Sequence, residues 1–584
     1  MHLVTTAETR FWKENTNLLF LGEWCNTYEN GKQTDKRNYE VLPYHWDDRR
    51  KLYGDYLYLD SLYEKTLLQL RKLLNQLHGV DYSLRYWRII VGPWLYCFIQ
   101  ILYDRYLSIQ CAFKSGKVTS TYICSYSISD WLPDNFSVFH RWIVGDPYNH
   151  FIYSRIIELS GIIPYEGVSC DEGGKQAINA VTNHPKKSVI KFLKKLSTIY
   201  GLLLPGKLNK ILFIYSHLDF FDLIKIHLAI KQIPYFNPPD IKLNNITVDK
   251  EIRSKFCLNK SSNDFEKILY TLISEQIPLN YIEGYKLMNK RSLRFYPEHP
   301  TIIFSANVNN TNDSFKFWSA YHTERGTKLY GTQHGGHYGT GLWSSTTAHE
   351  IKICDKFYSW GWTSNKQKKI IPLSAAYFNK LKRVTPSHSG KILLILTGIP
   401  RYSYHLFSIP VAASGGLSYL KEQYRFVNAL SVGMRKQLVV RLDKQDYGWS
   451  QYERWKDEIP NVECYNGSMT IYEQLKQSRL AVCTHNATTV LETLAANFPT
   501  IIFWNTSQWE LSEYSKPLFE KLQIAGIFHQ TPEAAADKVK AIHEDVATWW
   551  KQPEVQNARN AFCCSFARNS DSWINEWKSE LTTY

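Results

Sequence analysis

The C-terminal third of the chain alternates short apolar runs with segments of helical length. Four such runs, with few polar residues inside them, lie at 391–397, 437–441, 480–484 and 500–504. Runs of this kind are typical of parallel strands that are covered by helices on both faces of a sheet. The pattern therefore predicts a doubly wound, Rossmann-like α/β domain, which we place at residues 386–584.

Helix-start signals support this interpretation. Thr531 is suited to cap a helix, Pro532 fits its first position and Glu533 its first turn. The segment 373–390 ends in a run of small and polar residues with a proline and a glycine. We interpret it as the connection between the two halves of the chain.

The N-terminal half shows the same alternation of apolar runs and helix-length segments, but less regularly. Candidate strands lie at 18–21, 88–91, 211–215, 302–305 and 328–333. Between 105 and 200, and between 235 and 300, the periodicity is too weak to predict elements. We expect residues 1–385 to form an acceptor-side α/β domain, so that two Rossmann-like domains face a central cleft.

Composition limits the class of protein. The 584 residues are enough for two or more domains with substantial cores. Aromatic residues make up 15% of the chain, which suits sugar-stacking surfaces, although packed cores use the same residues. The net charge of +15 favours anionic partners. Because the basic residues are dispersed and no zinc-finger or RNA-recognition signature accompanies them, we expect no nucleic acid partner.

Cysteine usage and the N-terminus bear on location. The eleven cysteines include no Cys-x-x-Cys pair, which argues against a disulfide framework or zinc site and for a reducing cytosol. Residues 1–14 have no signal-peptide core. The apolar stretches 89–103 and 402–420 are too short or are broken by glycine and proline. We expect a cytoplasmic protein whose contact with the inner membrane would be peripheral.

The segment 484–492 carries the clearest functional signal. It reads Thr-His-Asn-Ala-Thr-Thr-Val-Leu-Glu, follows a predicted strand and opens a predicted helix. Small hydroxyl residues at such a junction bring backbone N–H groups and the helix dipole to a phosphate. The segment therefore predicts the binding site of a nucleotide-activated donor.

A second candidate site follows the predicted strand 328–333. Gln333, His334, Gly335 and Gly336 stand at its end, where open α/β sheets bind ligands and glycines let the backbone approach them. Histidine titrates near neutrality, so His334 is suited to take a proton from an acceptor hydroxyl. A turn histidine bonded to the backbone is the alternative.

Several carboxylates remain alternative bases: Asp47, Asp48, Asp130 and Asp146. His349 and Glu350 are suited to orient a nucleotide or a loop, and a structural ion pair explains them equally well. Spacing along the chain does not distinguish among these residues.

Five segments together resemble a family of transferases encoded in bacterial surface-polysaccharide gene clusters, such as O-antigen and capsule clusters. These segments are 87–94, 104–105, 333–339, 360–362 and 484–492. The likeness spans most of the chain.

The chain is more distantly similar to GT-B glycosyltransferases such as teichoic acid polymerases and capsule ulosonic acid transferases. In the polymerases a His-Gly loop is implicated as base, and a hydroxyl-rich turn holds a cytidine nucleotide. His334-Gly335 and Thr488-Thr489 resemble those positions in kind.

At two places the sequence departs from the pattern of the polymerases, so the identity of the donor stays open. A second glycine, Gly336, follows the His-Gly pair, and His485-Asn486 stands where the polymerases tend to have an acidic and an aromatic residue.

The resemblance implies displacement at an anomeric carbon with the nucleotide as leaving group. His334 would deprotonate the acceptor, while helix amides and the hydroxyls of Thr488 and Thr489 would stabilise the departing phosphate. Glu492 would hold the ribose, unless it is a solvated helix carboxylate. The other candidates for the donor site are Gly398, Arg401, His405, His485, Asn486 and, with a surface ion pair as its alternative, Arg441.

The implied function is a glycosyltransferase with a CMP-activated ulosonic acid as preferred donor and a surface glycan or lipid-linked glycan as acceptor. A nucleoside-diphosphate sugar is the next donor, and a CDP-polyol phosphotransferase is a second enzyme hypothesis. A non-catalytic scaffold or nucleic-acid-binding protein is favoured only by the charge. Because the chain has no Asp-x-Asp triplet, we predict transfer without a metal ion or cofactor.

Overall fold

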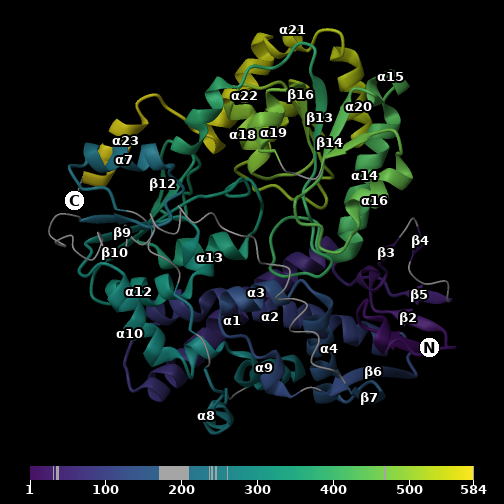
Figure 1. Ribbon diagram of the computed structural model, residues 1–584, viewed down its shortest axis with the longest axis vertical. Helices are drawn as coiled ribbons and strands as arrows, with labels where there is room; N and C mark the ends of the chain where they lie inside the picture. Colours follow the sequence, from purple (N-terminus) through teal and green to yellow (C-terminus); the bar gives the residue numbers. More distant parts are fainter. Residues whose placement is uncertain are drawn as a thin grey trace.

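The computed structural model describes residues 1–29, 32–33, 38–125, 127–169, 210–235, 237, 241–243, 246–258, 261–465 and 469–582. These residues form three parallel sheets of five, five and six strands (Figure 1), and a short antiparallel hairpin of β3 (Tyr28–Glu29) and β4 (Lys32–Gln33). The prediction of an α/β fold with parallel sheets is confirmed, but the chain has one sheet more than expected.

The C-terminal sheet contains all four predicted runs. Its strands are β13 (Lys391–Ile395), β14 (Leu438–Arg441), β15 (Glu463–Tyr465), β16 (Ser478–Cys483), β17 (Thr500–Phe503) and β18 (Phe528–His529). Their order is β15-β14-β13-β16-β17-β18, so the winding direction reverses between β13 and β16. This is the doubly wound Rossmann order, in which ligands bind in the crevice at the reversal.

Helices cover both faces of this sheet (Figure 1) and enclose a hydrophobic core that continues into the middle sheet through Tyr338, Phe357 and Trp360. Thr531 caps α20 as predicted, since its side chain accepts a hydrogen bond from the amide of Ala534. The helices are α14 (Ala412–Ala429), α15 (Val432–Arg435), α16 (Gln451–Glu458), α17 (Ile471–Leu475), α18 (Thr488–Ala495), α19 (Lys516–Ile524), α20 (Pro532–Ile542), α21 (Val546–Trp550) and α22 (Pro553–Phe566).

The middle sheet contains the strands predicted at 211–215, 302–305 and 328–333. It consists of β8 (Ile211–Phe213), β9 (Ile302–Ser305), β10 (Lys328–Thr332), β11 (Lys356–Ser359) and β12 (Ile370–Pro372), in the order β12-β11-β10-β9-β8. The helices between β8 and β11 along the chain are α7 (Phe220–Ala229), α8 (Lys250–Lys255), α9 (Asp264–Gln276), α10 (Tyr285–Phe295), α11 (Val308–Thr311), α12 (Asp313–Thr323) and α13 (Ser345–Ile353). Of these, α9 packs against α2 and α4, and α8 packs against α9.

The first sheet is the one that the sequence did not separate from the middle sheet. It consists of β1 (His2–Val4), β2 (Leu18–Phe20), β5 (Tyr39–Val41), β6 (Ser120–Ser125) and β7 (Tyr165–Ser169), in the order β5-β2-β1-β6-β7. Its helices are α1 (Arg49–His78), α2 (Leu84–Lys114), α3 (Phe136–Trp142) and α4 (Asp146–Ser160). Because one hydrophobic core joins this sheet to the helices of the middle sheet, residues 1–385 contain two sheets but pack together.

The strand predicted at 88–91 is wrong. These residues belong to α2, a 31-residue helix capped by Ser83 that packs against α1, α4, α12 and α13. The helix lies at the centre of the molecule and is buried on most sides, so its sequence is apolar without helical periodicity (Figure 1). A short apolar run of this kind cannot be told from a buried strand by its pattern alone.

The last helix crosses back from the C-terminal domain. In α23 (Trp573–Thr582), Trp573, Trp577 and Leu581 are buried in a core shared with the middle sheet. The ring of Trp577 lies 5.3 Å from that of Phe304 in β9. The predicted C-terminal domain, 386–584, therefore ends in a helix that packs on the preceding half.

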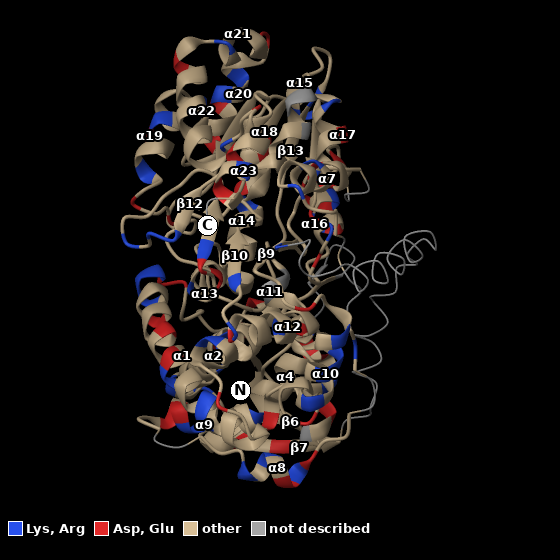
Figure 2. Ribbon diagram, turned by 90° about the vertical axis from the view of Figure 1, so that its left-hand side faces the viewer, with Lys and Arg blue, Asp and Glu red and all other residues tan. Residues whose placement is uncertain are grey.

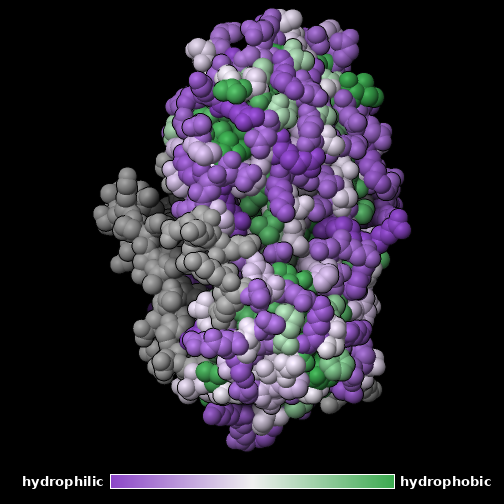
Figure 3. Space-filling model, turned by 90° about the vertical axis from the view of Figure 1, so that its right-hand side faces the viewer, coloured by the Kyte–Doolittle hydropathy of each residue, from purple (hydrophilic) through white to green (hydrophobic). Residues whose placement is uncertain are grey.

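The surface is mixed in character. Basic and acidic residues are interspersed along the ribbon in Figure 2, and apolar residues form small separate groups on the face in Figure 3. No helix in the described ranges combines the length and apolarity needed to span a bilayer. Nine of the described cysteines have free thiols and Cys124 is disulfide-bonded, which is less than a disulfide framework.

Candidate active site

The loop after β10 lies at the carboxyl edge of the middle sheet, as predicted. Gln333 is fully buried and holds this loop in shape. Its Oε1 accepts hydrogen bonds from the amide of Trp360 at 3.0 Å and from Nε1 of Trp362 at 2.8 Å, and its Nε2 donates to the carbonyl of Gly335 at 2.8 Å. Gln333 is therefore a support for the loop, and Trp360 and Trp362 are part of that support.

His334 is oriented by a buried carboxylate. Its Nε2 lies 3.0 Å from Oε1 of Glu350, which projects from α13 and is 1% exposed. The hydroxyl of Tyr338 contacts the same ring nitrogen and donates to the other oxygen of Glu350 at 2.8 Å. Asn310 donates its side-chain amide to Glu350 as well. Glu350, which the sequence left between orienting a loop and forming an ion pair, orients the candidate base.

The chemistry of His334 follows from this arrangement. A carboxylate beside Nε2 favours the tautomer that carries its proton there, which leaves Nδ1 as an acceptor. Nδ1 of His334 forms no hydrogen bond with any described residue, and the side chain is 21% exposed. Burial and the nearby Glu350 raise the pKa of Tyr338, so its hydroxyl stays protonated as a donor. The site can accept a proton from a hydroxyl that approaches Nδ1.

A second histidine lies next to this ring and was not found from the sequence. The ring centroids of His217 and His334 are 5.8 Å apart. His217, with φ of 63°, and Tyr215, with φ of 51°, both adopt left-handed backbone conformations in the loop after β8. Such conformations are uncommon for residues other than glycine and gather at functional sites. The sequence feature that could have pointed to His217 is its place two residues after the predicted strand 211–215.

The segment after β16 lies at the reversal point of the C-terminal sheet. Thr484, His485 and Asn486 are buried there, and Ala487 precedes α18 without a side-chain cap. The amides of Thr488 and Thr489 have no hydrogen-bond partner among the described residues. Amides and a helix dipole in this position are suited to bind an anion, and that role of the segment stays a prediction.

Two buried polar atoms accompany these amides. Nδ1 of His485 and Nδ2 of Asn486 have no hydrogen-bond partner in the described part of the chain. Burial lowers the pKa of His485 to about 4, so its ring is neutral. Buried polar atoms ordinarily form hydrogen bonds. Two such atoms without a partner at a helix start point to a ligand or water there.

The two candidate sites touch. The amide of Gly336 donates to Oγ1 of Thr488 at 3.0 Å, across 152 positions of sequence. A Cβ placed on Gly336 would lie 2.2 Å from the carbonyl carbon of Ala487, whereas one on Gly335 would be 3.5 Å from Thr488. Gly336 is thus the position that requires glycine. The loop that carries the candidate base and the start of α18 meet between the middle and C-terminal sheets.

A protein-family comparison now agrees with these motifs. The model of the LIC12162 family transferases matches residues 1–581. The chain belongs to the LIC12162 family of transferases. No curated protein sequence matches the transferase. The prediction that this protein is a transferase is confirmed.

Similar solved structures include several glycosyltransferases. MurG of Acinetobacter baumannii is 12% identical, with 64% of the transferase and 100% of MurG covered and a TM-score of 0.31. Anabaena Alr3699/HepE, solved with UDP and glucose, is 11% identical over the same shares, with a TM-score of 0.36. The outer core galactosyltransferase WaaB is 10% identical over 52% of this chain and 81% of WaaB, with a TM-score of 0.31. At these scores the fold class rests on the transferase's own sheets.

Arg401 of the transferase is placed away from the predicted donor role. It is 5% exposed, and its guanidinium donates to the carbonyls of Trp24 and Tyr447 at 2.7 and 3.1 Å and to the carboxylate of Asp146. These contacts connect the C-terminal domain to the first sheet. With its hydrogen-bond donors directed at protein groups, Arg401 is a link between domains rather than a phosphate ligand.

The remaining donor-site candidates also have protein partners. Gly398 donates its amide to Asp443 at 3.0 Å, and Arg441 donates to the carbonyl of Met469 at 3.1 Å. Glu492 is buried, not solvated, and accepts from the hydroxyl of Tyr377. In addition, His405 is half-buried and its ring stacks on Phe407, and desolvation lowers its pKa to about 3. Gly398, His405 and Arg441 lie near the carboxyl edge of the C-terminal sheet, and Glu492 lies in α18.

The alternative bases serve other contacts. Asp48 caps α1, and Asp47 accepts from a hydroxyl at the start of α14. Asp130 closes a 3-10 turn, and Asp146 binds Arg401. None of these contacts involves the loop that carries the candidate base.

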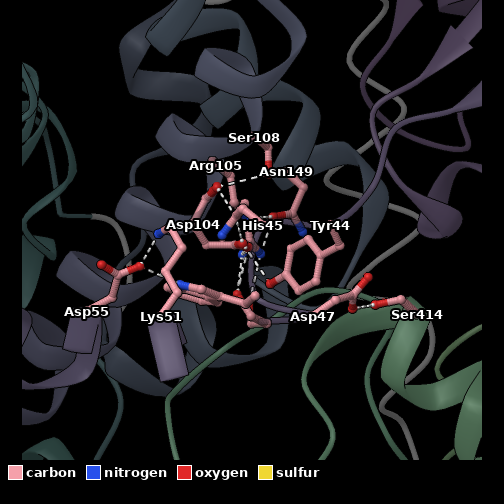
Figure 4. Close-up of polar contacts among 12 residues, drawn as sticks. Tyr44, His45, Asp47, Lys51, Asp55, Asp104, Arg105, Ser108, Asn149 and Ser414 are labelled. Carbon is pink, nitrogen blue, oxygen red and sulfur yellow. Dashed lines mark hydrogen bonds and ion pairs between the residues drawn. The ribbon is translucent and has the colours of Figure 1, made fainter. Parts of the chain in front are cut away.

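The motif residues Asp104 and Arg105 form a buried network with His45 (Figure 4). Arg105 donates to the side chain and carbonyl of Ser403, at 2.6 and 2.8 Å, and so links α2 to the loop after β13. Burial alone would raise the pKa of Asp104, but Arg105 and His45 outweigh it and lower that pKa to about 2. This network positions the domains and does not contact the candidate site.

Proposed function

We propose that the transferase is a metal-independent, GT-B-type glycosyltransferase that moves a sugar from a nucleotide-activated donor to a hydroxyl of a surface glycan. The observation that supports it most is the contact between Gly336 and Thr488. This contact joins the loop that carries the oriented histidine to the uncapped start of α18. A general base and a phosphate site in that relation are what transfer from a nucleotide requires.

In the proposed reaction the acceptor hydroxyl attacks the anomeric carbon of the donor. A bond forms between the acceptor oxygen and that carbon, and the bond from the carbon to the phosphate oxygen breaks. Nδ1 of His334 takes the hydroxyl proton, and Glu350 stabilises the resulting imidazolium. The amides and hydroxyls of Thr488 and Thr489 stabilise the charge that grows on the departing phosphate.

A CMP-activated ulosonic acid is the donor we prefer, because the His-Gly loop and the hydroxyl-rich helix start resemble those of enzymes that use cytidine nucleotides. A nucleoside-diphosphate sugar comes second. A CDP-polyol phosphotransferase would use the same phosphate site and differs in the group transferred. The mass added to the acceptor, a sugar residue or a polyol phosphate, separates the two enzyme classes.

The first test is thermal-shift binding of CMP, CDP, UDP, GDP and dTDP. One nucleotide should stabilise the wild type and Thr271→Ala, an exposed control on α9, but not the double variant Thr488→Ala/Thr489→Ala. Stabilisation scales with the ratio of free nucleotide to Kd, so each concentration is raised to saturation. If no nucleotide stabilises the wild type, the non-catalytic scaffold hypothesis replaces this proposal.

Metal independence has its own test. Activity should persist in EDTA, since the helix start and threonine hydroxyls take the part of a cation at the leaving phosphate. Activity that is lost in EDTA and restored by manganese would contradict this part of the proposal.

A further inference from the structure

A groove of about 400 Å³ lies beside the loop that carries His334. It opens against the face of α13 that carries Thr347 and Ile351, a different face from that of Glu350. Helices α1 and α13 lie side by side along this edge of the molecule (Figure 2). Five aromatic side chains line the groove: Tyr53, Tyr56, Trp343, Trp362 and Tyr514.

Three of these rings pack against one another. The centroids of Tyr53 and Tyr56 in α1 lie 5.1 and 6.1 Å from that of Trp343, and the two tyrosine rings are within 14° of parallel. Tyr53 is 37% exposed, and Tyr514, which also lines the groove, is 44% exposed. Aromatic faces with polar tips suit ligands that combine C–H surfaces with hydroxyl groups.

The rest of the lining mixes aliphatic and polar side chains and is almost uncharged. Leu342, Ile351 and Ile370 supply apolar surface, and Ser344, Thr347 and Gln367 supply hydroxyl and amide groups. Lys352 is the one charged residue of the described lining, and its ammonium lies 3.0 and 2.9 Å from Asp60 and Glu64. A cation already paired in this way adds little attraction for a phosphate or carboxylate. The lining therefore favours an uncharged, hydroxyl-rich ligand.

The groove shares a wall with the catalytic loop. His337 and Gly339 line it, and Trp362 is the residue that donates to Gln333. From the C-terminal domain, Ser512 donates its hydroxyl to the carbonyl of Gly339 at 2.6 Å. A ligand in the groove thus contacts the loop and both halves of the chain at once.

We propose that this groove binds an uncharged stretch of the acceptor oligosaccharide, away from the sugar that reacts. The proposal rests on the proposed function and extends it to the substrate class of a second subsite. Sugar rings stack on Tyr53 and Tyr514, and their hydroxyls bond to the polar side chains between the aromatic rings. A lipid tail fits this lining less well, since it would leave those polar groups without partners.

The test measures glycan binding without any nucleotide. Labelled full-length wild type, Tyr53→Ala/Tyr514→Ala and Tyr53→Phe/Tyr514→Phe are applied to an array of immobilised bacterial surface oligosaccharides. Tyr452→Ala, equally exposed at 45% but on α16, is the matched control. The alanine pair should weaken binding by about tenfold or more, because two stacking surfaces are lost, while the phenylalanine pair and the control bind as wild type does.

The same variants are then compared in turnover. The alanine pair should raise the KM for the acceptor by about the same factor and leave kcat and the donor KM within about twofold of wild type. Wild type that binds no oligosaccharide, or an alanine pair that binds as wild type does, overturns the proposal. So does tyrosine-dependent binding to phosphatidylglycerol vesicles that contain a polyprenyl phosphate, if oligosaccharides do not bind.

Failure of this proposal and failure of the proposed function are distinguishable. Nucleotide stabilisation without glycan binding contradicts the groove alone. Tyrosine-dependent glycan binding without stabilisation by any nucleotide contradicts the donor site and leaves the groove as a glycan-binding site.

Discussion

At the scale of the residue, the candidate base is defined by a side chain that the sequence did not single out for that role. Glu350 is buried on α13 and holds His334 through Nε2, while Tyr338 and Asn310 complete the bonding of its carboxylate. A buried carboxylate beside an imidazole stabilises the protonated ring that forms when a hydroxyl is deprotonated.

We therefore expect His334→Ala to lower kcat by about 10²–10⁴-fold, and Glu350→Gln to lower it less, because the ring remains but its charged partner is lost. Nucleotide-induced thermal shifts should be unchanged in both variants. Steady-state kinetics measures the effect, with the exposed His388→Ala as control. Near wild-type turnover by His334→Ala would assign the base to another residue.

Asp104 gives a pH-dependent prediction. Its pKa is lowered to about 2 in the folded protein, against 3.8 for an ordinary aspartate, so its charged form stabilises the folded state. This contribution is fully present above about pH 4 and is lost as pH falls toward 2. The melting temperature of Asp104→Asn should lie below that of wild type by a constant amount from pH 7 to about 4. The difference between the two melting temperatures should become smaller below about pH 4. A difference that does not depend on pH would contradict this account.

At the scale of the element, the contact between the loop after β10 and the start of α18 depends on one glycine. A Cβ on Gly336 would meet the backbone of Ala487 and Thr488 at 2.2 and 2.3 Å, and backbone atoms cannot rotate away. The loop would have to move away from the helix. The base and the phosphate site would then lose the spacing that transfer requires.

Gly336→Ala should lower kcat/KM by about 100-fold, since displacement of a catalytic group by about 1 Å has that order of effect. The fold should remain, because Gly336 lies in a loop outside the strands and helices. Gly433→Ala is the control, as a Cβ there meets nothing within 4 Å. Circular dichroism and kinetics on both variants check the prediction, and normal activity of Gly336→Ala would show that the loop tolerates the shift.

At the scale of the whole molecule, buried polar links hold the first sheet against the C-terminal domain. Arg401 binds Asp146, and Arg105 binds Ser403. At the surface of the same junction, Arg49 pairs with Glu510 at 2.6 Å. Two of these three links are buried, so loss of one partner leaves an unpaired group inside the protein.

Arg401 distinguishes the sequence interpretation from the structural one. If Arg401 held a donor phosphate, Arg401→Ala would abolish the nucleotide-induced shift and change the unliganded melting temperature little. From the structure we expect the reverse, a lower melting temperature with the nucleotide shift retained. Asp146→Ala/Arg401→Ala should recover part of the loss, because no unpaired charge remains. Thermal melting of wild type and the two variants with and without nucleotide measures both effects.

What the sequence determined by itself is local. The runs 391–397 and 500–504 are strands because apolar segments of that length, flanked by turn residues, suit a buried parallel sheet. Thr531 caps its helix because a threonine oxygen can accept an amide at that position. The motifs 333–339 and 484–492 lie at strand ends for the same local reason.

Only the tertiary structure decided what depends on distant partners. Residues 88–91 are helical because α2 is surrounded by other helices, and its uniform apolarity hides its period. The first sheet is separate from the middle sheet because strand pairing joins segments far apart in the chain, such as β1 with β6. Glu350 faces His334, and Arg401 faces Asp146, through contacts across 16 and 255 positions. Local pattern fixes the conformation of a segment, whereas the partner of each side chain is set by packing between segments, which no local pattern encodes.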